Sequence, residues 1–393
     1  MPNFKIVSKT EDFNDFDEQV NKHRRRIALR AILIIAVVLA VSTAVYSYLD
    51  RKVYVDYSIT AKSVRSDSDT AQYMTFNGHV LKYSQDGAEA FNGLNKTMWN
   101  VTYEMQKPHV STCENYVALG DEGSTQIVVV DDKGNQSTID TRLPIMDFTV
   151  AAQGVVAAVL EDSGATRINV YDRNGVQLAE LKCTMTQSGY PIDISLSPDG
   201  TLLGVSYVRM DEGELVSSIA FYNFGDVGQN EVDNYVSGYD YKDAIFPRIK
   251  FLSDGAAVAI GDTRMVTFGG GQKPEVLSDI EFENEVQSVF YGDQTIAIVF
   301  RDNKNHDSYK LNLYNPKGKL ILEKGFELNY TDIQISKNRI LIYNEGECLI
   351  INKRGFEKYS GKFEDSVLLM TTTSTPEKYL LVNRDITQMI RLN

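Results

Sequence analysis

Residues 170–175 of this chain read Val-Tyr-Asp-Arg-Asn-Gly, a strand-like segment that ends in a polar turn closed by glycine. The pattern returns at residues 313–318 as Leu-Tyr-Asn-Pro-Lys-Gly. Asp or Asn followed by Gly is a strong hairpin signal, because these residues accept the backbone conformations that tight turns need. The stretch therefore predicts a β-hairpin, and its return predicts a repeated β unit.

Turns of this kind divide most of the chain at nearly even intervals. Seven of them end in Gly87, Gly134, Gly175, Gly225, Gly270, Gly318 and Gly355, spaced by 47, 41, 50, 45, 48 and 37 residues. A period in the forties with several strands per unit is typical of a β-propeller. We interpret each glycine as the connection between the third and fourth strands of a blade. Because no segment after residue 50 keeps a helical apolar period, we predict an all-β body.

The last residues of the sequence decide the predicted number of blades. After Gly355 there is material for three strands, at 366–372, 378–383 and 386–392, without a fourth. Residues 53–59 (VYVDYSI) can supply the fourth strand and close the ring, which leaves fewer exposed strand edges. This arrangement predicts eight blades. Seven blades is the alternative, if residues 63–91 extend a neighbouring blade.

A basic segment followed by an apolar segment precedes the repeats. Ala31–Leu49 holds 19 residues without a charge, enough for a helix that nearly spans a bilayer of about 30 Å. Five basic residues precede it, namely Lys22, Arg24, Arg25, Arg26 and Arg30, and two follow closely. This bias predicts a cytoplasmic tail (1–26), a transmembrane helix (27–49) and an extracytoplasmic propeller (53–393) in a single-pass cell-membrane protein. The alternative is a cleaved signal peptide, with Ser42-Thr43-Ala44 as the cleavage site.

The composition narrows the classes of partner and cofactor. Residues 53–393 hold 31 basic and 47 acidic residues, and a body so acidic repels phosphate backbones and anionic headgroups. We therefore expect no nucleic-acid partner. Cys113, Cys183 and Cys348 are widely spaced and lack metal-ligand spacing, so we expect small buried side chains, with one disulfide as the alternative.

The quoted motifs also resemble a known group of proteins. The turns at 171–175 and 314–318, the basic-then-apolar anchor and the acidic body together resemble a family of bacterial membrane-anchored β-propellers of unknown function. The general architecture is similar to WD40-like and quinoprotein-like propellers, although the Gly-His and Trp-Asp signatures of WD40 repeats are missing from this sequence. The resemblance implies a propeller fold and supplies no catalytic residues.

Motifs for catalysis, metals or cofactors are weak or missing in the sequence. No GxSxG motif occurs, and neither His109 nor His306 has a second His or Cys at metal-ligand spacing. Residues 302–307 (DNKNHD) lack the glycine and terminal glutamate of a calcium loop. One tryptophan, Trp99, is too few for the repeated docking motifs of a quinone-dependent dehydrogenase. We predict no cofactor, no metal site and no assigned catalytic residue.

The most distinctive segment outside the anchor is residues 230–250, which combine aromatic and acidic side chains. Rings stack on sugars or peptides and carboxylates accept hydrogen bonds, so this combination suits partner recognition. The candidate residues for binding a ligand or partner are Tyr235, Tyr239, Tyr241, Phe246, Asp240 and Asp243. The alternative is that the tyrosines pack between blades.

These observations favour a non-catalytic propeller, tethered to the membrane, that presents a binding or scaffolding face outside the cell to an envelope protein or a surface glycan. Whether the protein is an enzyme stays open. The alternative is an envelope hydrolase of glycans or peptides that uses carboxylates at the mouth of the propeller channel. A cluster of inward-pointing carboxylates on several blades would favour that alternative.

Overall fold

The computed structural model describes residues 11–65, 70–93, 95–185, 188–292, 294–302 and 308–393, and residues 11–19 by backbone only. The chain divides into two compact units, Met1–Val53 and Tyr54–Asn393. The first unit contains one helix, α1 (Glu11–Arg51). Within it, Val20–Arg51 is long and apolar enough to cross a membrane, with a mean hydropathy of 2.5 in its most apolar window, and a signal sequence passes the same test.

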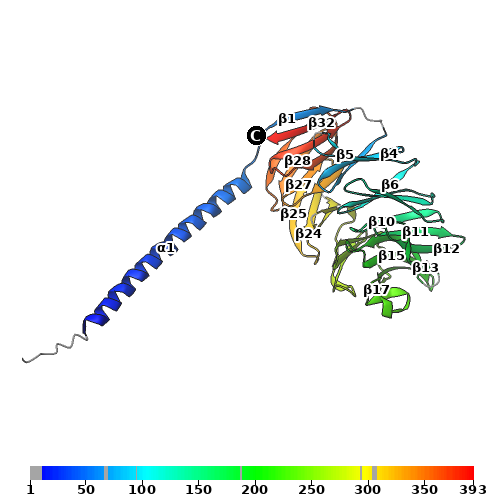
Figure 1. The fold of residues 1–393 in the computed structure, drawn as a ribbon, viewed down its shortest axis with the longest axis horizontal. Helices are drawn as coiled ribbons and strands as arrows, with labels where there is room; N and C mark the ends of the chain where they lie inside the picture. Colours follow the sequence, from blue (N-terminus) through cyan, green and yellow to red (C-terminus); the bar gives the residue numbers. More distant parts are fainter. Residues whose placement is uncertain (1–10, 66–69, 94, 186–187, 293, 303–307) are drawn as a thin grey trace, which may run out of the picture. The chain divides into compact units, whose positions relative to one another are not determined.

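The second unit is an eight-bladed propeller built from eight four-stranded antiparallel sheets (Figure 1). Blade 1 contains β2 (Gln72–Phe76), β3 (His79–Tyr83), β4 (Gly87–Phe91) and β5 (Thr97–Thr102). Blade 2 contains β6 (Pro108–Cys113), β7 (Tyr116–Asp121), β8 (Gln126–Asp131) and β9 (Gln136–Asp140). Blade 3 contains β10 (Ile145–Val150), β11 (Val156–Asp162), β12 (Ala165–Tyr171) and β13 (Gln177–Cys183). Blade 4 contains β14 (Tyr190–Leu196), β15 (Leu202–Asp211), β16 (Glu214–Asn223) and β17 (Tyr235–Tyr241), with short 3-10 turns at Gly228–Asn230 and Val232–Asn234.

The remaining blades continue the same order around the ring. Blade 5 contains β18 (Arg248–Ser253), β19 (Ala256–Ile260), β20 (Arg264–Gly269) and β21 (Glu275–Glu281). Blade 6 contains β22 (Val286–Gly292), β23 (Thr295–Arg301), β24 (Tyr309–Tyr314) and β25 (Leu320–Phe326). Blade 7 contains β26 (Asp332–Ile335), β27 (Arg339–Tyr343), β28 (Glu347–Asn352) and β29 (Glu357–Lys362). Blade 8 contains β30 (Val367–Thr372), β31 (Lys378–Asn383), β32 (Ile386–Leu392) and β1 (Tyr57–Val64).

Blade 8 closes the ring, as predicted, by combining β1 from early in the sequence with β30, β31 and β32 from late in the sequence. β1 pairs antiparallel with β32, with Tyr57 opposite Leu392 and Val64 opposite Ile386 (Figure 1). The prediction of eight blades is therefore confirmed. The closing strand is Tyr57–Val64, a few residues later than the predicted 53–59.

The hydrophobic core is divided among the interfaces between blades. Among the described residues there are eight clusters of buried apolar side chains, one at each interface between neighbouring blades. Both faces of an inner strand are therefore covered, which explains continuous apolar runs such as Ile296–Phe300 in β23. Cys183 and Cys348 are buried and Cys113 is half-buried, and all three are free thiols.

The repeated polar turns owe their shape to one side chain each. Asp172 Oδ1 accepts the N–H groups of Asn174 and Val176 at 2.9 and 2.8 Å, and Asp131, Asn315 and Asn352 each make the same pair of contacts in their own blades. Gly175 then turns with φ at +85°, a conformation that favours glycine. These turns connect third and fourth strands, as predicted.

One of the seven glycines was assigned wrongly. Gly87 begins β4 and follows the second strand of blade 1, so it does not mark the third-to-fourth connection. That connection follows Phe91, where Asn92 Oδ1 accepts the N–H of Lys96 at 3.3 Å. The error arose because second-to-third turns use the same polar residues and glycine as third-to-fourth turns.

Candidate functional site

The segment singled out in the sequence forms the outer strand of blade 4. Residues 235–241 are β17, which pairs with β16, so four of the six candidate residues lie in regular sheet. Tyr239 and Tyr241 lie on the face toward blade 5, where they are half-buried against the core cluster. Phe246 is fully buried in that cluster, with its ring centroid 4.8 Å from that of Tyr241. These three rings stabilise the interface between blades 4 and 5.

The two predicted carboxylates are held by arginines of the same region. Asp240 binds Arg209 at 2.8 Å and accepts the hydroxyl of Ser218 at 2.6 Å; the Arg209 contact is the main reason that the pKa of Asp240 is lowered. Asp243 binds Arg264 at 2.6 Å. Tyr235 remains 46% exposed at the start of β17. Of the six candidates, Tyr235 is therefore the side chain best placed to contact a partner without disturbing the sheet.

A second group of polar residues lies on the inner strands that surround the propeller axis. The group, called here the channel cluster, consists of His109, Asp147, Asp193, Arg248 and Tyr291. These residues belong to β6, β10, β14, β18 and β22, the first strands of blades 2 to 6. Each of these five blades contributes one member of the cluster.

Contacts in the channel cluster join neighbouring blades. His109 Nε2 lies 3.8 Å from Asp147 Oδ1, and the His109 ring stands edge-on against Phe148. Asp193 Oδ1 lies 3.5 Å from Arg248, while Asp193 Oδ2 accepts the N–H of Ile249 at 2.6 Å. A strand edge that faces a channel has unpaired N–H groups, and the Asp193 carboxylate satisfies one of them.

Burial changes the acidity of the two carboxyl groups in the cluster. The Asp193 side chain is only 11% exposed, and burial raises its pKa to about 6 although the N–H of Ile249 and the charge of Arg248 act against the shift. Burial also raises the pKa of Asp147, and the N–H of Phe148 limits that rise. Both groups therefore hold a proton more readily than ordinary aspartates.

Tyr291 reaches the cluster from blade 6. Its pKa is raised, first by burial and then by the charge of Asp193, which belongs to blade 4. Blade 5, whose Arg248 also acts on the pKa of Tyr291, lies between blades 4 and 6, and Tyr291 packs against the core of blade 5. The Tyr291 hydroxyl is buried and has no hydrogen-bond partner among the described residues. Leaving such a group unsatisfied costs about 1–3 kcal/mol, so the site favours a polar group beside it.

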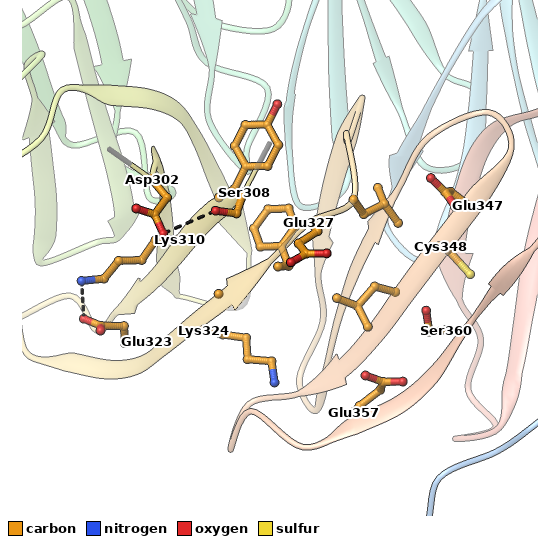
Figure 2. Close-up of a pocket in the computed structure, with 15 residues that line it drawn as sticks. Asp302, Ser308, Lys310, Glu323, Lys324, Glu327, Glu347, Cys348, Glu357 and Ser360 are labelled. Carbon is orange, nitrogen blue, oxygen red and sulfur yellow. Dashed lines mark hydrogen bonds and ion pairs between the residues drawn. The ribbon is translucent and has the colours of Figure 1, made fainter. Parts of the chain in front are cut away.

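An open cleft of about 760 Å³ lies between the outer parts of blades 6 and 7 (Figure 2). Its labelled side chains are mixed in charge, and Lys310 binds Glu323 at 2.9 Å across β24 and β25. A similar cleft of about 610 Å³, lined by Tyr103 and Gln136, lies between blades 1 and 2. Because the hollow recurs at a second interface, we attribute it to the divergence of the outer strands.

Metal binding has no visible basis in the described part of the chain. Among those residues, no three His, Cys, Asp or Glu side chains are arranged to hold a metal ion. His306 and the greater part of the 302–307 loop lie outside the described residues. His109 is paired with one carboxylate, Asp147, and a single such pair is too few ligands for a structural metal.

The chemistry of the channel cluster is hydrogen bonding to a polar ligand. It combines two partly or largely buried carboxylates with an exposed guanidinium group, an exposed imidazole and a buried phenol hydroxyl, which suits a ligand with several hydroxyl or amide groups. Sequence reasoning missed this cluster. Its members lie 38 to 55 residues apart, and only the repeat of polar residues within predicted first strands could have indicated them.

Comparisons with known proteins agree with the fold. The family model described as "Family of unknown function (DUF5711)" matches residues 50–392. The propeller is similar to BamB from Moraxella catarrhalis, with 11% identity, a TM-score of 0.50 and coverage of 86% of this chain and 100% of that one. It is also similar to Sqt1 from Chaetomium thermophilum, with 12% identity, a TM-score of 0.52 and coverage of 88% and 99%. The search of curated proteins gave no match.

Proposed function

Because the chain belongs to the family of unknown function DUF5711, we propose its function from its own geometry: a membrane-tethered propeller that binds a surface glycan at the channel cluster. Two features support this proposal. The apolar helix supplies the tether, and the tether raises the effective concentration of the propeller at the membrane surface. The Tyr291 hydroxyl is buried without a hydrogen-bond partner among the described residues, and the charges of Asp193 and Arg248 act on its pKa.

The Tyr291 hydroxyl is the single observation that carries the proposal. Sugar hydroxyls donate and accept hydrogen bonds, so one of them can satisfy the phenol while the Asp193 carboxylate accepts and the Arg248 guanidinium donates. The charges in the cluster are mixed in sign, which suits an uncharged, hydroxyl-rich ligand better than a strongly ionic one. Glycan binding at this position uses groups that the fold already orients.

Calorimetric titration of the full chain in detergent micelles with soluble cell-wall glycan fragments tests the proposal. We expect Tyr291→Phe to weaken binding about tenfold, since one hydrogen bond contributes about 1 kcal/mol or more in a buried site. Tyr235→Phe, which alters a side chain that is 46% exposed on the outer strand β17, is the matched control. Equal affinity in both variants, or no glycan binding at all, would contradict the proposal.

Hydrolysis is the second candidate, because Asp147 and Asp193 lie on adjacent blades and both have raised pKa values. A protonated carboxyl group can act as a general acid while a second carboxylate assists. Release of new reducing ends in the same glycan samples decides between the two. Product that disappears in Asp193→Asn and in Asp147→Asn supports a hydrolase, and binding without product supports a non-catalytic receptor.

If the partner is an envelope protein, we expect it to contact the exposed Tyr235. Proximity crosslinking in cells, compared between the natural chain and Tyr235→Ala, tests this face. Changing Tyr235 alone is cleaner than changing all three tyrosines, because Tyr239 and Tyr241 support the interface with blade 5. A defined set of neighbours that the variant loses would place a protein partner on β17.

A further inference from the structure

The strand order assigns every connection to one of two ends of the propeller. Within a blade of four antiparallel strands, first-to-second and third-to-fourth turns lie at one end, and second-to-third turns and links between blades lie at the other. β1 is the fourth strand of blade 8, and it begins at Tyr57 just after α1. The end that contains Tyr57 and the third-to-fourth turns is called here the near end, and the opposite end is the far end.

The chain is fixed to the propeller immediately after the helix. The N–H of Tyr54 donates to the Lys358 carbonyl at 2.7 Å, and the Lys358 ammonium group lies 5.7 Å from the centre of the Tyr54 ring. The N–H of Val55 donates to the Asn393 carbonyl at 3.3 Å. Only two residues separate Arg51, the last residue of α1, from Tyr54. Three residue steps span at most about 10 Å, so a helix in a membrane keeps the near end close to the lipid surface.

The near end is basic over blades 6, 7 and 1, although the propeller as a whole is acidic. The third-to-fourth turns 315–319 and 352–356 contain four basic residues and no acidic one, and Lys96 precedes β5 in blade 1. The five residues are Lys96, Lys317, Lys319, Lys353 and Arg354. All are exposed except Lys353, which is half-buried, and the acidic residues close to these turns in the sequence or fold are Glu357, which begins β29, and Asp56, which precedes β1.

The far end of the same part of the ring has the opposite charge. The links that lead into blades 6, 7 and 8 are residues 282–285, 327–331 and 363–366. They contain five acidic residues and no basic one, namely Glu283, Glu285, Glu327, Glu364 and Asp365. The net negative charge therefore hides a division between a basic near end and an acidic far end.

Exposed apolar side chains accompany the basic turns. They lie at the start of the outer strands and on the segment that follows the helix: Val55, Met98, Leu320, Ile321 and Phe356. Val55 is 89% exposed, and the other four are between 37% and 46% exposed. Basic residues beside exposed apolar ones are typical of surfaces that contact anionic bilayers, where the charges meet headgroups and the apolar groups enter the interface.

We propose that the near end of blades 6, 7, 8 and 1 binds the anionic phospholipid headgroups of the bilayer that α1 spans. The inference rests on the tether in the proposed function and adds an orientation to it. Blade 4 stands opposite blade 8, and its third-to-fourth connection holds Asp226, Glu231 and Asp233, which anionic lipid repels. The propeller therefore tilts with blades 6 to 1 on the membrane and blade 4 away from it.

Energy transfer to labelled headgroups in nanodiscs tests the proposal with the full chain. A donor dye is placed on Leu320→Cys at the near end or on Glu364→Cys at the far end, in a background where the half-buried Cys113 is serine. Strands of six or seven residues separate the ends by about 20 Å. In discs that contain phosphatidylglycerol we expect at least threefold more transfer from position 320 than from position 364.

Two triple variants with the same change of charge are compared, one at the near end as the test and one at the far end as the control. Lys317→Glu, Lys319→Glu and Arg354→Glu together should reduce transfer from position 320 to the level seen in phosphatidylcholine discs. Lys107→Glu, Arg142→Glu and Lys242→Glu, all exposed and at the far end, should leave it unchanged. Equal transfer from both labels, or no response to the near-end variant, overturns the lipid contact. Loss of the chain from the discs after alkaline washing would instead contradict the tether.

Discussion

Asp193 connects the channel geometry to a measurable property of the folded protein. Its carboxyl group is nine-tenths buried and accepts one backbone hydrogen bond, and its pKa is raised to about 6 against about 3.9 in an unfolded chain. The folded state therefore binds this proton more tightly than the unfolded state. Its contribution to stability is fully present below pH 4 and is lost as the pH rises through 6.

We expect Asp193→Asn to remove this pH dependence. Relative to the variant, the natural protein should lose up to about 3 kcal/mol of unfolding free energy between pH 4 and pH 7. Denaturant unfolding of the full chain in detergent, followed by fluorescence of the single tryptophan, Trp99, measures the difference. A constant difference between the two proteins over this range would show that Asp193 titrates normally.

Gly134 provides a second prediction at the scale of one residue. Its φ is +84°, and a Cβ atom there would lie 2.5 Å from the Cβ of Trp99 in the neighbouring blade. Gly134→Ala should therefore destabilise the propeller by about 3 kcal/mol, through backbone strain and a clash. Gly164→Ala is the control, because φ at Gly164 is +95° but no atom lies near an added Cβ. We expect it to destabilise the propeller by about 1 kcal/mol, through backbone strain alone. Thermal unfolding followed by circular dichroism compares them.

Turn residues could be predicted from the sequence, whereas channel residues could not. The Asp172 side chain shapes its own turn through Asn174 and Val176, so the information is local. Asp193 and Tyr291 acquire their properties from residues of other blades, which come together only when the blades pack against each other. For the same reason, the sequence does not show that Tyr241 is half-buried against blade 5.

At the scale of elements, ring closure depends on the short strand that follows the anchor. Tyr57 lies opposite Leu392, and its ring stands edge-on to Tyr359 of blade 7, with centroids 6.2 Å apart. It thus stabilises both the sheet of blade 8 and its interface with blade 7. Because an early strand, β1, pairs with a late strand, β32, the third strand of blade 8 does not remain as an unpaired sheet edge.

Removing the Tyr57 ring should loosen this closure. We expect Tyr57→Ala to destabilise the propeller by about 2 kcal/mol, through lost burial and the lost aromatic pair. Ser58→Ala alters the next residue, which is exposed, and should change the stability by less than about 0.5 kcal/mol. Hydrogen exchange of β32 amides should accelerate in the first variant only. Equal protection in both would mean that blade 8 closes without this contact.

At the scale of the whole molecule, orientation follows from the charges that flank α1. Arg24, Arg25, Arg26 and Arg30 precede the apolar stretch, and Arg51 and Lys52 follow it, so the excess of basic residues lies on the N-terminal side. This bias predicts an N-terminus in the cytoplasm and a propeller outside. A cleaved signal sequence has the same charge bias, because it also begins with basic residues before an apolar core.

Thiol labelling in intact cells, combined with the mass of the membrane-extracted protein, separates these outcomes. With Cys113 changed to serine, an impermeant maleimide should label Glu364→Cys in intact cells and Asn21→Cys only after permeabilisation, since both positions are exposed. The extracted protein should have the full-length mass of 44.1 kDa. A mature N-terminus near Ala44 would identify a signal peptide and release the propeller from its tether. Labelling of Asn21→Cys alone in intact cells would reverse the topology and place the channel cluster, with its glycan site, on the cytoplasmic side.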